Sequence, residues 1–163
     1  MRFFGVLAAV GAMLSSNGCA TVDDDRIPSS PVKITFQTQS QWEAYGVSGA
    51  LDSRIFIKQD RIPDNFPYTS LTYTGFGGVL LVGDIHGNPV AYDLACPVER
   101  SATVRITVDH EANNAYCPKC GSVYDIYTNY GHPLSGKAAH DGYGLQRYIV
   151  GGGMQGEYMT ISR

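Results

Sequence analysis

Three cysteines in the second half of the chain are the residues best suited to chemistry. Residues 96–99 read Cys-Pro-Val-Glu, and residues 117–121, which begin 21 positions after Cys96, read Cys-Pro-Lys-Cys-Gly. Two thiolates three residues apart on a tight turn can hold one metal ion, and the glycine after Cys120 lets that turn close. Glu99 stands at the same spacing from Cys96 as Cys120 does from Cys117. The two turns therefore predict a metal centre with Cys96, Cys117, Cys120 and Glu99 as candidate ligands.

The elements around these turns are predicted to be short strands. Alternation of apolar and polar residues predicts strands at 32–36 and 54–58, and a continuous apolar run predicts another within 77–84. Further strands are predicted at 90–95, 103–108, 115–117, 145–150 and 157–161, with one helical turn at 39–45 and a proline-rich loop at 62–67. Each cysteine turn then lies at the end of a strand. The fold class is all-β, with helix scarce.

From Gly77 to Ile161 the sequence resembles the Rieske [2Fe-2S] iron-sulfur family. The second cysteine turn is followed by Gly-Ser-Val-Tyr-Asp at 121–125, then Gly-Lys-Ala at 136–138 and Leu-Gln-Arg-Tyr at 145–148. These are similar to that family's Gly-Ser-aromatic-Asp, Gly-Pro-Ala and Leu-x-x-Tyr motifs. The resemblance implies an antiparallel β-sandwich with a small metal-binding subdomain, about residues 93–140, made of two cysteine-bearing loops.

The ligand set departs from that family. The resemblance requires Cys-x-His in the first loop and Cys-x-x-His in the second, two thiolates for one iron and two imidazoles for the other. Val98 and Cys120 stand where the two histidines should be, so a standard cluster cannot form. The chain's four histidines fall at other positions, and each is expected to be a turn or surface residue. They are His86, His110, His132 and His140.

Four explanations for the cysteines stay open. A mononuclear zinc ion suits Cys96, Cys117 and Cys120, with Glu99 as a less certain fourth ligand. A modified [2Fe-2S] cluster with three thiolates would have a potential below the Rieske range. A structural disulfide, either Cys117 with Cys120 or one of them with Cys96, would leave one thiol unpaired. The last explanation is a vestigial site with free thiols and no metal.

The N-terminus predicts export and lipidation. Arg2 precedes an apolar run at 3–14, too short to cross a bilayer but long enough for a signal sequence. Gly18 before Cys19 resembles a bacterial lipoprotein signal, which implies a signal peptide at 1–18 and a lipid on Cys19; a plain secreted protein is the alternative. The three aspartates at 23–25 are similar to a surface-export signal of Bacteroidetes-type bacteria. Residues 19–31 are expected to be a solvated tether, and 32–163 the folded domain.

Composition narrows the functional classes. The chain has 163 residues, a formal net charge of -3 and no cluster of basic residues, so nucleic acid is not expected as a partner. Since no catalytic motif or phosphate-binding loop is present, we expect no catalytic activity of its own. The prediction is a membrane-anchored protein of the bacterial cell envelope with a cysteine-rich metal centre and an accessory or electron-transfer role, facing an envelope redox or binding partner. The alternative is a metal-free or disulfide-stabilised binding module.

Overall fold

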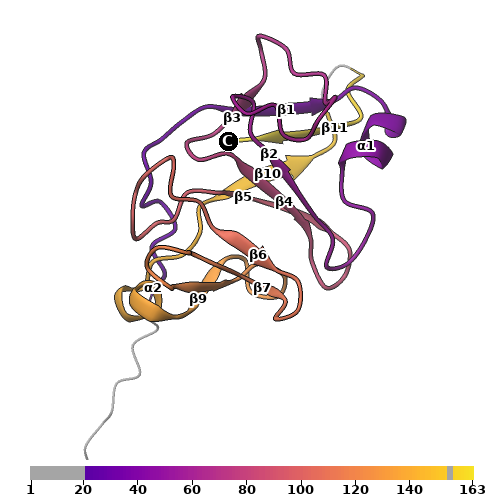
Figure 1. The fold of residues 1–163 in the computed structure, drawn as a ribbon. Helices are drawn as coiled ribbons and strands as arrows, with labels where there is room; N and C mark the ends of the chain where they lie inside the picture. The colour runs from indigo at the N-terminus through magenta and orange to yellow at the C-terminus, as the bar shows by residue number, and fades with distance from the viewer. Residues whose placement is uncertain (1–20, 154–155) are drawn as a thin grey trace, which may run out of the picture.

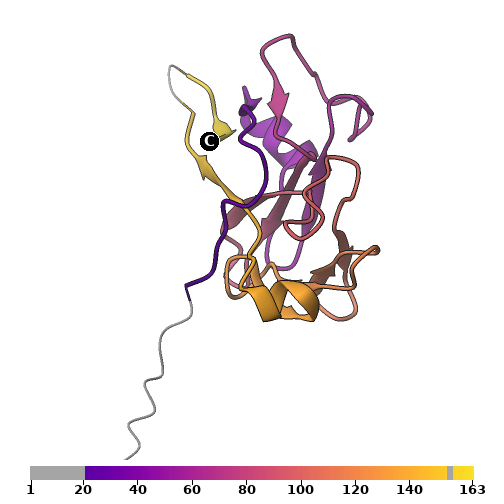
Figure 2. The same cartoon turned by 90° about the vertical axis from the view of Figure 1, so that its left-hand side faces the viewer.

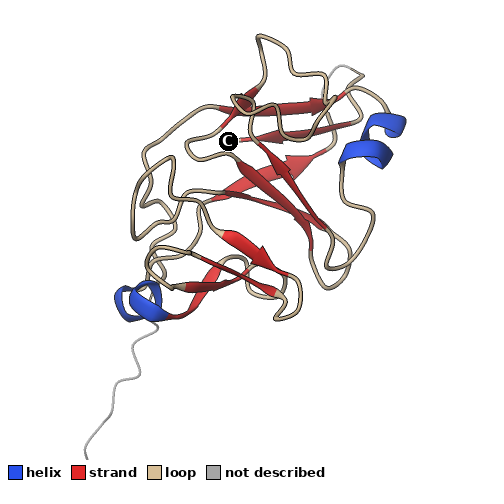
Figure 3. Cartoon of the chain, in the orientation of Figure 1, coloured by secondary structure: helices blue, strands red, loops and turns tan. Residues whose placement is uncertain are grey.

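The computed structural model describes residues 21–153 and 156–163, which form eleven strands and two short helices (Figures 1 and 3). In chain order these are β1 (Val32–Phe36), α1 (Gln39–Tyr45), β2 (Ser53–Phe56), β3 (Tyr73–Thr74), β4 (Val79–Gly83), β5 (Pro89–Asp93), β6 (Thr107–Asp109), β7 (Asn114–Tyr116), β8 (Val123–Asp125), β9 (His132–Ser135), α2 (Gly136–Asp141), β10 (Arg147–Gly151) and β11 (Met159–Ser162). The described residues are therefore all-β, as predicted.

The strands form two antiparallel sheets. The larger has the order β2-β4-β5-β10-β11-β1-β3, and the smaller has the order β6-β7-β8-β9. Figure 1 shows the smaller sheet and α2 together at one end of the molecule, with α1 at the other end. All pairings within the two sheets are antiparallel.

Strand β4 lies between two hydrophobic cores and contributes side chains to both. All five of its residues are buried, and successive side chains point to opposite faces of the sheet. Leu80 and Val82 join a core that also contains Cys96 and Cys117. Val79 and Leu81 join a second core, which is rich in aromatic rings. A continuous apolar run in this sequence is therefore a strand covered on both faces, and one of the two faces supports the cysteines.

Several elements lie where the sequence predicted them. β1 and α1 have the predicted bounds, and Thr38 caps α1 by accepting a hydrogen bond from the Gln41 amide (3.2 Å). The proline-containing segment 62–67 forms a loop with one isolated bridge, at Ile62.

The strand predicted at 103–108 is wrong in its first half. Val104 and Ile106 bond to the backbone around Cys96 and Leu94, and β6 begins only at Thr107. Three short strands, β3, β8 and β9, and helix α2 were not predicted. Segments this short carry too few residues for a periodic pattern.

The N-terminal segment differs from the solvated tether that the sequence suggested. Residues 21–31 lie along the domain, and Ile27 among them is buried. Cys19 and the predicted signal peptide lie outside the described residues. Within 21–153 and 156–163, no helix has the length and apolar character needed to cross a membrane.

Candidate metal centre

The two cysteine turns share one backbone design. The Arg100 amide donates to the Cys96 carbonyl, and the Gly121 amide donates to the Cys117 carbonyl, both at 2.9 Å. The residue that closes each turn has a left-handed backbone, with φ of 51° at Arg100 and 70° at Gly121. Glycine adopts this conformation without steric cost, whereas arginine does so less readily. The second turn is thus the more easily formed of the two.

Backbone bonds hold each turn in place. The Cys96 amide donates to the Val104 carbonyl, and the Cys117 amide donates to the Ser122 carbonyl, both at 2.9 Å. The first turn follows β5 of the larger sheet, and the second joins β7 to β8 of the smaller one. The cysteines therefore lie in turns attached to two different sheets, and Cys96 and Cys117 meet in one core that residues of both sheets line.

The structure brings all three predicted cysteines together. Their sulfur atoms lie within 4.8 Å of one another, and the Sγ atoms of Cys96 and Cys120 are 3.6 Å apart. For a metal-sulfur bond of about 2.3 Å, the edge of a tetrahedron of sulfurs measures about 3.8 Å. The measured separation is close to that edge, so the three sulfurs could hold a single metal ion.

Two further polar groups touch the sulfurs. The Tyr124 hydroxyl is 3.5 Å from Cys96 Sγ, and the Ser122 hydroxyl is 3.3 Å from Cys120 Sγ. Both residues are fully buried. The sequence reasoning had not assigned them to the site. A signal was present, because Ser122 directly follows the second turn and Tyr124 lies two residues further on, in β8.

The surroundings of Cys96 and Cys120 shift the pKa values of their thiols in opposite directions. Burial raises the pKa of the Cys96 thiol to about 12, against smaller opposing effects that include hydrogen bonds from Tyr124 and from the backbone of Glu99 and Val98. Burial acts the same way on Cys120, but hydrogen bonding with the Ser122 hydroxyl and backbone, together with Cys117 and Cys96, outweighs it and lowers the pKa. Burial also raises the pKa of Tyr124, so its hydroxyl keeps a proton to donate. A metal ion would have to displace the Cys96 proton, which coordination to a cation does.

Glu99 and the histidines lie differently from the cysteines. The Glu99 carboxylate forms an ion pair with Lys119 at 2.5 Å, which links the first turn to the second. Among the described residues, the group of donors close enough to share a metal comprises the three cysteines, without Glu99 or a histidine. Val98 packs against the hydrophobic core beside them.

This donor set suits soft or borderline metals. Sulfur ligands favour zinc, copper(I) and iron over the hard cations magnesium and calcium. Three thiolates on a divalent ion carry a net charge of −1. Lys119 stands between Cys117 and Cys120 in the second turn, and Glu99 first, then these two cysteines, raise the pKa of its ammonium group. A tetrahedral ion would have a fourth position, open to Glu99 or to water.

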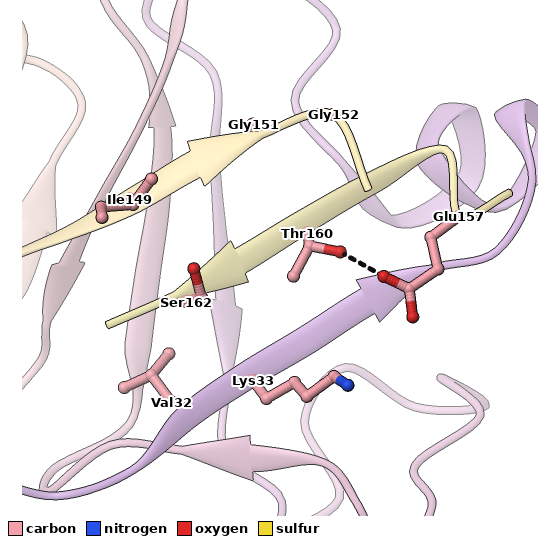
Figure 4. Close-up of a pocket in the computed structure, with 8 residues that line it drawn as sticks. All are labelled: Val32, Lys33, Ile149, Gly151, Gly152, Glu157, Thr160 and Ser162. Carbon is pink, nitrogen blue, oxygen red and sulfur yellow. Dashed lines mark hydrogen bonds between the residues drawn. The ribbon is translucent and has the colours of Figure 1, made fainter. Parts of the chain in front are cut away.

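A separate hollow lies on the larger sheet. It has a volume of about 380 Å³ and is formed by the adjoining strands β1, β10 and β11. Lys33 and Glu157 line it, and Glu157 accepts a hydrogen bond from Thr160 at 3.1 Å (Figure 4). Ile149 is 68% exposed at its edge. The lining contains no cysteine and no histidine, so this hollow does not offer the sulfur ligands of the cysteine cluster.

Comparison with known proteins adds no family to this description. A scan against models of protein families finds none that matches the chain, and a search of curated proteins finds no match. The site is therefore interpreted from its own geometry.

Proposed function

We propose that this protein is an envelope protein whose β-domain carries a mononuclear zinc ion bound by Cys96, Cys117 and Cys120. The observation that carries the proposal is the mutual proximity of the three sulfurs, within 4.8 Å of one another. Ligands on the two irons of a [2Fe-2S] cluster stand on opposite sides of its core, so sulfurs this close suit one ion better. The zinc joins the two sheets and stabilises the domain for an accessory role.

A Rieske-like scaffold is part of this proposal. Its support is the sequence resemblance, together with two antiparallel sheets and cysteine turns placed between them. Without imidazole ligands at positions 98 and 120, the scaffold serves a different centre. A modified [2Fe-2S] cluster with an electron-transfer role is the rival within the same site.

Metal analysis of protein purified without oxygen tests the proposal. We expect one zinc per chain, no iron and a colourless protein. Cys96→Ser and Cys120→Ser should each lose the zinc, whereas Tyr124→Phe should keep it, since that change removes a hydrogen bond and no ligand. Iron with an equal amount of labile sulfide would refute the zinc centre and support the modified [2Fe-2S] cluster with an electron-transfer role.

A second candidate function is a metal-free module stabilised by a disulfide. The Cys96 and Cys120 sulfurs, 3.6 Å apart, are one candidate pair for that bond. In an oxidising compartment such a bond would leave Cys117 as the single free thiol of the centre. Thiol titration of the metal-free protein, with and without a reductant, distinguishes a disulfide from three free thiols.

We also propose that the chain is anchored by lipid at Cys19 and acts beside a bacterial membrane, with an envelope redox or binding protein as partner. The support is the signal-like N-terminal sequence, which lies outside the described residues. Several acyl chains on one cysteine would give stable anchoring. Incorporation of labelled palmitate into the wild type but not into Cys19→Ser would support the anchor, and equal labelling would refute it.

A further inference from the structure

The segment that follows Cys19 is fastened to the domain close to its beginning. We call residues 21–31 the N-terminal strap. The Asp23 amide donates to the Gly142 carbonyl at 2.8 Å, and the Gly144 amide donates to the Asp23 carbonyl at 2.9 Å. These two bonds clamp Asp23 beside the C-terminal end of α2, where it forms a parallel bridge with Tyr143.

The acidic side chains add further contacts. Asp25 pairs with Arg163 at 2.8 Å and accepts a hydrogen bond from Gln146 at 3.3 Å. Asp24 lies 4.0 Å from the Arg147 guanidinium. The run of aspartates therefore meets cationic and polar partners on the folded domain. Individually these exposed pairs contribute little, so the backbone bonds at Asp23 are the main attachment.

The rest of the strap is fixed as well. Arg26 stacks on the Tyr143 ring, 3.8 Å from its centroid, and its carbonyl accepts a hydrogen bond from the Arg100 side chain at 2.9 Å. Ile27 is 4% exposed, and the Pro31 carbonyl accepts from the Gly75 amide at 3.1 Å. The strap is thus held at several points between Asp23 and Pro31.

This attachment shortens the free tether. From Cys19 to Val32, the first residue of β1, an extended chain could reach about 45 Å, but from Cys19 to Asp23 it reaches only about 14 Å. A domain of this size has a radius of gyration of about 14 Å, or a diameter of about 37 Å if spherical. The long tether would allow any orientation. The short one allows only the end near Asp23 to approach the anchor.

That end carries the cysteine centre. Figures 1 and 2 show the described chain beginning beside α2, with the smaller sheet adjacent. The Ala138 amide of α2 donates to the Ser122 hydroxyl at 3.0 Å, and that hydroxyl contacts Cys120. Ser122 therefore contacts both α2 and Cys120 and links the helix to the cysteine centre.

We propose that the strap holds the α2 end of the domain, and with it the cysteine centre, against the bilayer that carries the anchor. This inference rests on the proposed lipid at Cys19. The centre then faces partners in or on that membrane, while α1 and the hollow on the larger sheet face away from it.

Fluorescence quenching of lipidated, full-length protein in vesicles tests the orientation. The vesicles carry a spin-labelled phospholipid headgroup, and the emission of Trp42, the chain's single tryptophan, is subtracted as the wild-type baseline. His140→Trp places a reporter on α2, at a side chain that is 86% exposed. Leu71→Trp, at a residue 66% exposed two positions before β3, is the matched control.

The expected result is a quenched fraction several-fold larger for His140→Trp than for Leu71→Trp. A flexible insert of ten Gly and Ser residues between Thr21 and Val22 should remove this difference. Leu134→Trp on β9, 52% exposed, is a second reporter should the first variant not fold. Equal quenching of both ends in protein that floats with the vesicles would overturn the orientation alone. Protein that does not float would overturn the anchor and the orientation with it.

Discussion

Asp93 ties the first cysteine turn to the rest of the domain, and its replacement by asparagine is the most informative test of how the centre is positioned. The residue is fully buried three positions before Cys96. Its Oδ1 accepts from the amides of Gly77 (3.0 Å) and Ala95 (2.7 Å). Its Oδ2 accepts from the Phe76 amide (2.8 Å) and the Tyr148 hydroxyl (2.6 Å).

The magnitude follows from these four bonds. Burial raises the pKa of the Asp93 carboxyl, and the bonds from Tyr148 and the three amides act in the opposite direction. All four partners donate to the Asp93 oxygens. In Asp93→Asn the introduced NH₂ group cannot accept, so at least one buried amide loses its partner, at about 1–3 kcal/mol. The remaining bonds are weaker because an amide oxygen is a poorer acceptor than a carboxylate oxygen, at about 1 kcal/mol in total. We therefore expect a loss of about 3 kcal/mol, or a fall in Tm of about 10 °C for a domain of this size.

The assay is urea and thermal unfolding at neutral pH, on zinc-loaded and zinc-free protein. Zinc affinity should also fall, since the Ala95 amide that Asp93 holds directly precedes Cys96. Tyr148→Phe, which removes one donor and leaves the three amides paired, is the control and should cost about 1–2 kcal/mol. A loss below about 0.5 kcal/mol for Asp93→Asn, or an equal loss for Tyr148→Phe, would refute this reasoning.

Three further predictions concern the surroundings of the centre. Gly136→Ala should destabilise the domain by about 1–3 kcal/mol in a denaturation assay and weaken zinc binding. The reason is that Gly136 has a φ of 74° and an added Cβ would lie 2.9 Å from Ser122 Cα. Gly151→Ala is the control and should be close to neutral, because a Cβ added there would have no atom within 4 Å. Burial raises the pKa of Asp125, but hydrogen bonds from the turn that follows outweigh it and lower the pKa. This group therefore stabilises the fold above about pH 4 and loses that contribution as pH falls through its folded pKa, so Asp125→Asn should flatten the decline in stability below about pH 4. Glu99→Gln should retain stoichiometric zinc and lower zinc affinity far less than Cys120→Ser does, because Lys119 already engages the carboxylate; loss of zinc from Glu99→Gln would instead make it the fourth ligand.

The sequence by itself determined the local features. The spacing of Cys117, Cys120 and Gly121 specifies a turn that presents two thiols, and the alternation of residues specifies strands such as β1. The buried run of β4 marks a central strand, because only a strand covered on both faces needs apolar residues at every position. Such features depend on neighbours within a few residues, which is why sequence patterns can predict them.

Only the tertiary structure decided which groups meet. Cys96 and Cys120, 24 residues apart, come into contact because backbone pairing places their two turns, one after β5 and one between β7 and β8, against the same core. Backbone pairing also brings Ser122 and Tyr124 to the sulfurs, places Glu99 beside Lys119, and holds Asp23 beside α2. Each of these contacts depends on the pairing of distant backbone groups. The residues of either partner alone do not encode that pairing.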